Sequence, residues 1–390
     1  VSKRPTMTTK QNRRILEGLC VLDFTHVVAG PYATRVLADL GARVIKIDPP
    51  FQETANMPVQ SAGGPTRNLG KKSIALDLKH KPGLEVALQL AKMADIVVEN
   101  FRPGAMAQLG LGFKDINTIN PSLIYASISG FGQSGPSSSR RAYGAVAHAE
   151  TGWLWVQQQA AESAAPFAPG VTVADIVTAM NCVSAILAAL YDRAMTGKGQ
   201  HIDVTLMESQ IAMLSEIAGP ALDGSPVSNW QPFRHPIHET RDGHVTINLG
   251  TERNWIRIAE ALDHQEEPVP ENTEAANKMI AGWVSNFSTD EVAKRMDRTE
   301  APYGVVRSLH DAVKDPYFSD RGMVVQLEDS QTKPVKVIGS PLHFSEAASG
   351  PQSPSPLAGE HSKAILNELG YTDTQILQLL ETRTVMQQYR

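Results

Sequence analysis

The chain has 390 residues and a mass of 42.3 kDa, roughly two to three times the usual length of about 150 residues per domain. Its 42% apolar and 20% charged residues exclude wholesale disorder, and a net charge of −5 argues against a dedicated nucleic-acid binder. Two cysteines cannot form a disulfide framework, and no segment reaches the roughly 18 consecutive apolar residues of a membrane span. Because the polar N-terminal residues also lack the apolar stretch of a secretory signal, we expect a cytoplasmic protein without a membrane partner.

The first third of the chain alternates short apolar runs with helical patterns. The predicted strands are Cys20–Phe24, Val44–Ile47, Ile96–Val98 and Leu123–Ile128, and the predicted helices between them are Pro31–Leu40 and Pro82–Met93. Gly41 is placed to close the first helix in the left-handed conformation that helix ends favour. Strands separated by helices of this length predict an α/β fold with a parallel, doubly wound sheet.

A loop rich in glycine and serine, Ser129–Arg141, leaves the last of these strands at the carboxyl edge of the sheet, where open α/β sheets bind ligands. A helix around Ala145–Leu154 and the polar segment Gln157–Gly170 follow. The longest apolar helix is predicted over Val171–Met195, ended by Gly197.

Clustered prolines after residue 224 mark a change in composition, and we interpret 228–325 as a second, smaller α/β domain. It contains one alternating strand pattern and three helical ones: His244–Leu249, Asn254–Leu262, Ala275–Phe287 and Asp290–Met296. The remaining chain is divided into a large domain over 1–200, a linker over 201–227, and a return linker with a C-terminal segment over 326–390. The final predicted helix is Ser362–Leu369.

Several common catalytic motifs are missing. The turn Asp23–Pro31 follows the first strand but has one glycine, where dinucleotide binding needs three at fixed offsets. P-loop and Gly-x-Ser-x-Gly patterns are absent. His26 alone does not discriminate between structure and catalysis, and the histidines show no helical metal-ligand pairing, so we expect no metal.

Asp175 stands in the opening turns of the long helix. Six apolar residues have the spacing of a helix face that packs on the core: Val173, Ile176, Val177, Met180, Val183 and Leu187. Asp175 lies off that stripe, beside the small residues Ala179 and Cys182. It is either an acid that complements the positive helix end, worth roughly 0.3–1 kcal/mol, or a partly buried carboxylate that the helix end keeps ionised, as a carboxylate nucleophile requires. Spacing alone does not choose between these readings.

Basic residues recur beside the predicted strand ends and loops: Lys71, Lys72, Lys79, Arg102, Arg140 and Arg141. Any one of them is most simply a solvated surface charge. Together they suit a polyanionic ligand laid over the carboxyl edge of the sheet, with its phosphates held by cations and backbone N–H groups.

Eight segments in order resemble the class III CoA-transferases, the CaiB/BaiF family that includes formyl-CoA, carnitine and succinyl-CoA-dependent dicarboxylate transferases. They are Leu16–Pro50, Asn68–Lys79, Asp95–Gly112, Ile128–Pro136, Val173–Met180, Met195–Ser209, Ala301–Val306 and Gly359–His361. The resemblance runs from Leu16 to the C-terminus and is weakest between about 225 and 300.

The resemblance implies a Rossmann-like large domain completed by the C-terminal segment, a small domain, and two subunits interlocked as a homodimer. It implies that Asp175 is the catalytic nucleophile and that coenzyme A, as an acyl-CoA, is the bound substrate. The positions that match CoA contacts are Val28, Ala29, Leu76, Asp77, Lys79, Asn100, Phe101, Arg102, Arg141 and Tyr143. The expected activity moves CoA from a short dicarboxylyl-CoA, such as succinyl-CoA, to a small carboxylic acid through an aspartyl-CoA thioester.

Departures from the family pattern bear on the alternatives. Racemases of the same superfamily carry a catalytic histidine where this chain has Tyr143 and an acid where it has Gly144, so an acyl-CoA racemase or isomerase would lack its base. A non-catalytic CoA-binding subunit of a heteromer is a further alternative, against which the presence of Asp175 counts. Arg234 and His235, in a stretch without the glycine run of formyl-CoA transferases, are candidates to face the acceptor carboxylate.

Overall fold

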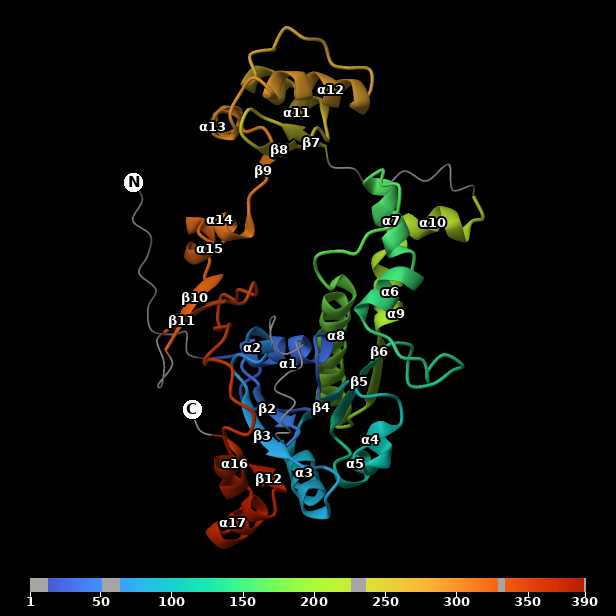
Figure 1. Cartoon of the computed structure of the whole chain (residues 1–390), viewed down its shortest axis with the longest axis vertical. Helices are drawn as coiled ribbons and strands as arrows, with labels where there is room; N and C mark the ends of the chain where they lie inside the picture. Colours follow the sequence, from blue (N-terminus) through green and yellow to red (C-terminus); the bar gives the residue numbers. More distant parts are fainter. Residues whose placement is uncertain (1–12, 51–63, 226–235, 329–333, 389–390) are drawn as a thin grey trace. The chain divides into compact units, whose positions relative to one another are not determined.

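The computed structural model describes residues 13–50, 64–225, 236–328 and 334–388. The chain forms two compact units, one made of residues 1–227 and 319–390 and the other of residues 228–318. Figure 1 labels the elements of both.

The larger unit is built on a seven-stranded sheet with the strand order β12-β3-β2-β1-β4-β5-β6. Its strands are β1 (Cys20–Asp23), β2 (Arg43–Asp48), β3 (Lys72–Leu76), β4 (Ile96–Glu99), β5 (Ile124–Ser129), β6 (His201–Thr205) and β12 (Val385–Met386). The first six are parallel, and β12 adds an antiparallel edge from the C-terminus beside β3. The predicted α/β class with a mainly parallel sheet is therefore confirmed.

Helices cover the two faces of this sheet (Figure 1). One core joins the β-strands to the long helix α8 and to α1, and the other joins them to α3, α5 and the C-terminal helices. The helices of this unit are α1 (Ala29–Asp39), α2 (Gly64–Arg67), α3 (Lys81–Met93), α4 (Ala105–Gln108), α5 (Phe113–Ile119), α6 (Gly144–Glu150), α7 (Trp153–Ala160), α8 (Val173–Thr196), α9 (Leu206–Met213), α10 (Ser215–Leu222), α16 (Ser362–Glu368) and α17 (Asp373–Glu381). Gly41 follows α1 with φ of 106°, as predicted.

Several elements of this unit differ from the sequence prediction. Residues 201–225, expected as a linker, form β6, α9 and α10, and β6 pairs with β5. Its polar His201 and Asp203 are exposed at the sheet edge, so the segment lacks the continuous apolar run of a central strand. The predicted final helix, α16, is followed by α17 and β12. A short two-stranded sheet of β10 (Val324–Leu327) and β11 (Val335–Ile338) completes the unit.

The buried face of α8 is not the predicted one. Its buried residues are Ala174, Asp175, Thr178, Ala179, Cys182, Val183, Ile186 and Ala189. Of the predicted apolar stripe only Val183 is buried, whereas Met180 and Leu187 are 39% and 37% exposed. Small side chains on the buried face let α8 lie close to α1 and the sheet, which leaves the larger apolar side chains on the outer face.

Among the described helices, α8 is the one that is long and apolar enough to cross a membrane, judged by length and composition alone. Core helices of globular proteins pass the same test, and the face of α8 that carries Asp175 packs against the sheet.

The smaller unit pairs a three-stranded antiparallel sheet with helices. Its strands are β7 (Ile237–Glu239), β8 (His244–Ile247) and β9 (Tyr303–Val305), and its helices include α11 (Glu252–Ala261), α12 (Thr273–Val284), α13 (Thr289–Thr299) and α14 (Leu309–Ala312). Helix α15 (Pro316–Asp320) spans the division between the two units. Val245, Ile247, Trp255 and Ile280 belong to a separate core. The alternating segment at His244 and the three predicted helices are confirmed.

Candidate active site

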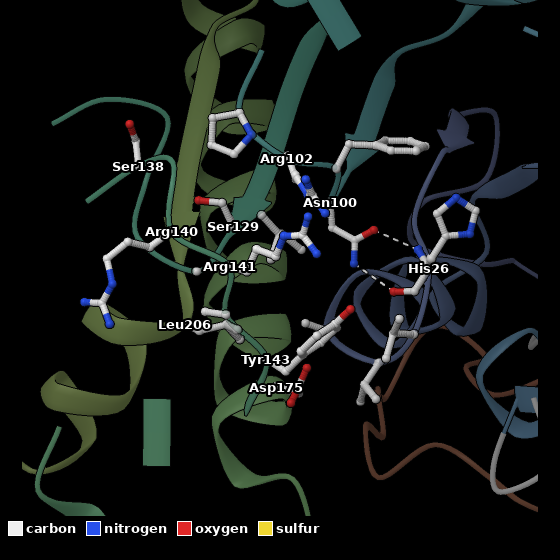
Figure 2. Close-up of a pocket in the computed structure, with 18 residues that line it drawn as sticks. His26, Asn100, Arg102, Ser129, Ser138, Arg140, Arg141, Tyr143, Asp175 and Leu206 are labelled. Carbon is white, nitrogen blue, oxygen red and sulfur yellow. Dashed lines mark hydrogen bonds between the residues drawn. The ribbon is translucent and has the colours of Figure 1, made fainter. Parts of the chain in front are cut away.

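A cavity of about 210 Å³ opens at the carboxyl edge of the large sheet (Figure 2). One wall is the turn after β1, from His26 to Ala29, and another is the segment Asn100–Pro103 after β4. Strands β1 and β4 are neighbours, and the chain winds away from them in opposite directions. This is the topological switch point at which open α/β sheets bind ligands.

The turn after β1 is held in an unusual conformation. Val27 has φ of 69°, a left-handed conformation that costs a β-branched residue on the order of 1–3 kcal/mol and persists only where its surroundings enforce it. Asn100, just after β4, enforces it, because its Oδ1 accepts the His26 N–H at 2.7 Å and its Nδ2 donates to the His26 carbonyl at 2.7 Å (Figure 2). Arg67 donates to the Val27 carbonyl. The backbone of Val28 and Ala29 is thereby fixed beside the cavity.

Asp175 lines the cavity from the first turn of α8 and is 8% exposed. Its carboxylate accepts the Ala29 N–H, and the positive charge of Arg67 acts on it. Burial outweighs both effects and raises the pKa of Asp175 above its ordinary value. The Asp175 Oδ2 lies against Gly144, where an added Cβ would stand 2.2 Å from that oxygen. Glycine at 144 therefore provides the space that the carboxylate occupies.

Two arginines supply positive charge to the same cavity. In Figure 2 Arg141 extends toward Asn100 and Arg102, with Tyr143 and Asp175 on the other side of it. No side-chain hydrogen bond or ion pair is found for Arg102 or Arg141 within the part of the chain that the structure describes. Arg140 points away from them, pairs with Glu150 and lies 4.4 Å from the centre of the Phe131 ring. Arg102 and Arg141 are thus the cations available to an anionic ligand.

Glu99 supports the segment that carries Arg102. It ends β4, is 3% exposed, and accepts the Phe101 N–H at 2.8 Å. Burial raises the pKa of Glu99 to about 7. The ring of Phe101 in turn meets the His26 ring edge-on at 5.2 Å, so the β1 and β4 loops contact each other through side chains as well as through Asn100.

Most of the predicted site residues meet at this cavity. It is lined by Val28, Ala29, Asn100, Phe101, Arg102, Arg141, Tyr143 and Asp175. Leu76, Asp77 and Lys79 do not line it. Leu76 is buried at the end of β3 beside β12, Asp77 accepts the Lys79 N–H at 2.9 Å, and Lys79 is exposed. Arg234 and His235 lie outside the described residues.

Other lining residues were not predicted. His26, Ser129, Ser138 and Leu206 line the cavity; Ser129 ends β5, and the other three lie in segments that follow a strand. The rule that carboxyl ends of parallel strands meet at one edge would have found His26 and Ser129, because both strands were predicted. Leu206 follows β6, which the sequence analysis assigned to a linker.

No group of three or more His, Cys, Asp or Glu side chains that could hold a metal occurs in residues 13–50, 64–225, 236–328 and 334–388. The described cavity therefore combines a buried carboxylate, fixed backbone N–H groups and two arginines. Fold and site together define an α/β protein that can bind an anionic ligand at the switch point and present a carboxylate to it.

Comparison with known proteins agrees with this class. Residues 16–362 match the profile of CoA-transferase family III. The succinyl-CoA:glutarate CoA-transferase of Homo sapiens is 32% identical, over 96% of this chain and 91% of its own length. The succinyl-CoA:mesaconate CoA-transferase of Haloarcula hispanica is 30% identical, over 91% of this chain and 96% of its own length. A crystal structure of a CaiB/BaiF family protein from Brucella suis superposes with a TM-score of 0.78 at 29% identity, covering 91% of this chain and 99% of its own.

The chain belongs to CoA-transferase family III, and the resemblance noted in the sequence is thereby confirmed.

Proposed function

We propose that this CoA-transferase moves CoA from a short dicarboxylyl-CoA, with succinyl-CoA as the favoured donor, to a second small dicarboxylic acid, with Asp175 as the nucleophile. The names of the human and Haloarcula relatives pair succinyl-CoA with glutarate and with mesaconate, which are both dicarboxylates. The observation that carries the proposal is the Asp175 carboxylate on the wall of the switch-point cavity, beside the Ala29 N–H and two arginines.

The proposed chemistry conserves the free energy of one thioester, which is held in a mixed anhydride between the thioester stages. A carboxylate oxygen of Asp175 attacks the donor thioester carbon, the C–S bond breaks, and a mixed anhydride and CoA thiolate result. The thiolate attacks the Asp175 carbonyl carbon, which releases the donor acid and leaves an aspartyl-CoA thioester. The acceptor carboxylate then attacks this thioester and releases the thiolate again. Attack of the thiolate on the acceptor carbonyl gives the new acyl-CoA and restores the Asp175 carboxylate.

Residues of the cavity have distinct roles in this scheme. Arg102 and Arg141 bind anionic groups of the CoA ester, because they are positively charged and line the cavity. The fixed turn of Val28 and Ala29 keeps a backbone N–H next to the reacting carboxylate. Leu76, Asp77 and Lys79, at the end of β3, contact a more distant part of the ligand, as the family resemblance implies.

The working form in this proposal is an interlocked homodimer. Support comes from the outer face of α8, where Met180, Leu187, Tyr191 and Met195 are 37–73% exposed in the single chain. A row of large apolar side chains on a helix of this length is typical of a surface that another subunit covers.

A transfer assay tests the activity. Purified protein with succinyl-CoA is offered glutarate, mesaconate, malate and the monocarboxylates acetate and butyrate, and new thioesters are identified by mass. We expect a dicarboxylyl-CoA product from the wild type and none from Asp175→Asn, which keeps the size of the side chain but not its charge. Exclusive use of monocarboxylates, or normal turnover by Asp175→Asn, would refute the proposal.

A further inference from the structure

The backbone N–H groups at the start of α8 need hydrogen-bond acceptors from outside the helix. The first four N–H groups of a helix have no partner within it, and a side chain just before the helix usually accepts one of them. Thr172 precedes α8 but makes no such bond. Asp175, the third residue of the helix, carries a carboxylate that could do so. A nucleophile engaged in that way would be turned from its substrate and weakened by the added hydrogen bond.

Identified acceptors exist for N–H groups on both sides of Asp175. The Val173 N–H donates to the Val171 carbonyl at 3.1 Å, and the Ile176 N–H donates to the Thr172 carbonyl at 3.3 Å. The Ala174 N–H is fully buried and donates to the Nε2 atom of His148 at 3.0 Å.

The surroundings of His148 favour its role as the acceptor of this hydrogen bond. It lies in α6, is 3% exposed, and its ring packs against that of Trp153 with centroids 5.0 Å apart. An Nε2 atom that accepts a hydrogen bond is unprotonated, so the ring is neutral with its proton on Nδ1. Burial lowers the pKa of His148, which favours this neutral form. His148 does not line the cavity, whose residues from α6 and its approach are Ala142 and Tyr143.

We infer that His148 is a positioning residue: it takes the buried Ala174 N–H at the start of α8, so that this donor does not draw the Asp175 carboxylate away from the cavity. This inference rests on the proposed role of Asp175 as nucleophile. Without the His148 acceptor, the buried Ala174 N–H has the adjacent Asp175 carboxylate as its nearest alternative. The carboxylate would rotate toward the helix to satisfy that N–H.

A matched pair of variants separates the acceptor from the ring. His148→Phe keeps a ring against Trp153 but removes the acceptor, whereas His148→Gln keeps an acceptor oxygen near the position of Nε2 without the titratable ring. The readouts are kcat and KM for succinyl-CoA and the single-turnover rate at which hydroxylamine traps the acylated enzyme. His264→Phe is the control, because His264 also stacks on a tryptophan, Trp283, but in the smaller unit.

We expect His148→Phe to lower kcat and the trapping rate by about ten- to a hundredfold, the change that one lost buried hydrogen bond can produce. KM should stay within about twofold because CoA contacts are untouched, and His148→Gln should retain kcat within about threefold. Equal rates for His148→Phe and wild type, or equal losses in Phe and Gln, would overturn the inference. If His148→Phe does not fold, His148→Asn replaces it, because the shorter asparagine side chain does not reach the Ala174 N–H. Wild-type rates for His148→Asn would overturn the inference in the same way. Wild-type protein that yields no trapped adduct would instead refute the proposed function.

Discussion

At the scale of single residues, Asp175 must satisfy two opposing requirements. A nucleophilic carboxylate has to be ionised, whereas burial favours its neutral form. The Ala29 N–H and the charge of Arg67 partly offset the burial, and the net result is a pKa above the ordinary range. A carboxylate of higher pKa is also a stronger nucleophile once it is ionised. The site therefore gains reactivity as long as the working pH stays above that raised pKa.

The raised pKa of Asp175 predicts the acid limb of the pH–rate profile, where the rate falls because Asp175 is protonated. The raised pKa means that Asp175 becomes protonated, and the enzyme inactive, at a pH above the value of about 3.9 of an ordinary aspartate. Single-turnover trapping rates measured across pH should show this limb. Arg67→Met removes a charge that lowers the pKa, so its limb should lie at still higher pH. A limb at or below that of a free aspartate, or one that Arg67→Met moves to lower pH, would contradict the account.

Gly144 gives a second prediction at this scale. In Gly144→Ala the new Cβ would stand 2.2 Å from the Asp175 Oδ2, so the carboxylate has to move. Because a shift of about 1 Å can cost about a hundredfold in rate, we expect kcat to fall by roughly that factor with CoA binding retained. Gly282→Ala is the control, since an added Cβ there meets nothing within 4 Å in α12. Normal turnover by Gly144→Ala would show that the carboxylate works from another position.

At the scale of elements, a buried ion pair ties β1, α1 and β3 together below the site. Lys71 donates to the Asp23 Oδ2 at 2.8 Å, and both side chains are fully buried. Lys71 also donates to Thr34 and to the Pro31 carbonyl in α1, while Asp23 accepts the Thr25 N–H at 2.9 Å. The positive charges of Lys46 and Lys71, together with these bonds, outweigh burial and hold the pKa of Asp23 far below its usual range.

Removing the cation should therefore be costly. Lys71→Met leaves the buried Asp23 carboxylate without its ion-pair partner, so we expect a loss of about 3–5 kcal/mol of unfolding free energy. The neighbouring Lys72→Met is the control: Lys72 is 44% exposed and lies 3.9 Å from Glu368, and its loss should cost less than about 1 kcal/mol. Denaturant unfolding of the two variants measures the difference. Similar midpoints would show that the pair does not stabilise the fold.

Pattern alone predicted much of the first half of the sheet and its helices. The runs that became β1, β2, β4 and β5 are mostly apolar because parallel strands are buried on both faces. The edge strand β6 lacks that signal, since its outward residues are polar. Strand β3, which begins with Lys72 and Ser73, was also not predicted as a strand. Helical periodicity found α8 but assigned its outer apolar face to the core.

The candidate site was predictable only in part. Asp175 could not be distinguished from a helix-end acid by spacing, and its role followed from the family resemblance. His148 carries no sequence signal, because its partner is a backbone N–H brought to it by packing of α6 on α8. The contact of Gly144 with Asp175 likewise depends on how two helices meet, which residue periodicity does not encode.

At the scale of the whole molecule, the outer face of α8 predicts the assembly. If a second copy covers this face, sedimentation should give a dimer that persists on dilution. Leu187→Glu places a charge there and should weaken or abolish the dimer, whereas Leu377→Glu, on the exposed side of α17, should leave it intact. A stable wild-type monomer, or a dimer indifferent to Leu187→Glu, would contradict the proposed assembly.

The central claim is that the Asp175 side chain itself becomes acylated, and mass spectrometry of its peptide tests this most directly. Enzyme is incubated with succinyl-CoA, trapped with hydroxylamine and digested. The account predicts a hydroxamate on the peptide that contains Asp175, dependent on succinyl-CoA and absent from Asp175→Asn. An unmodified Asp175 peptide from protein that transfers CoA at its full rate would contradict it.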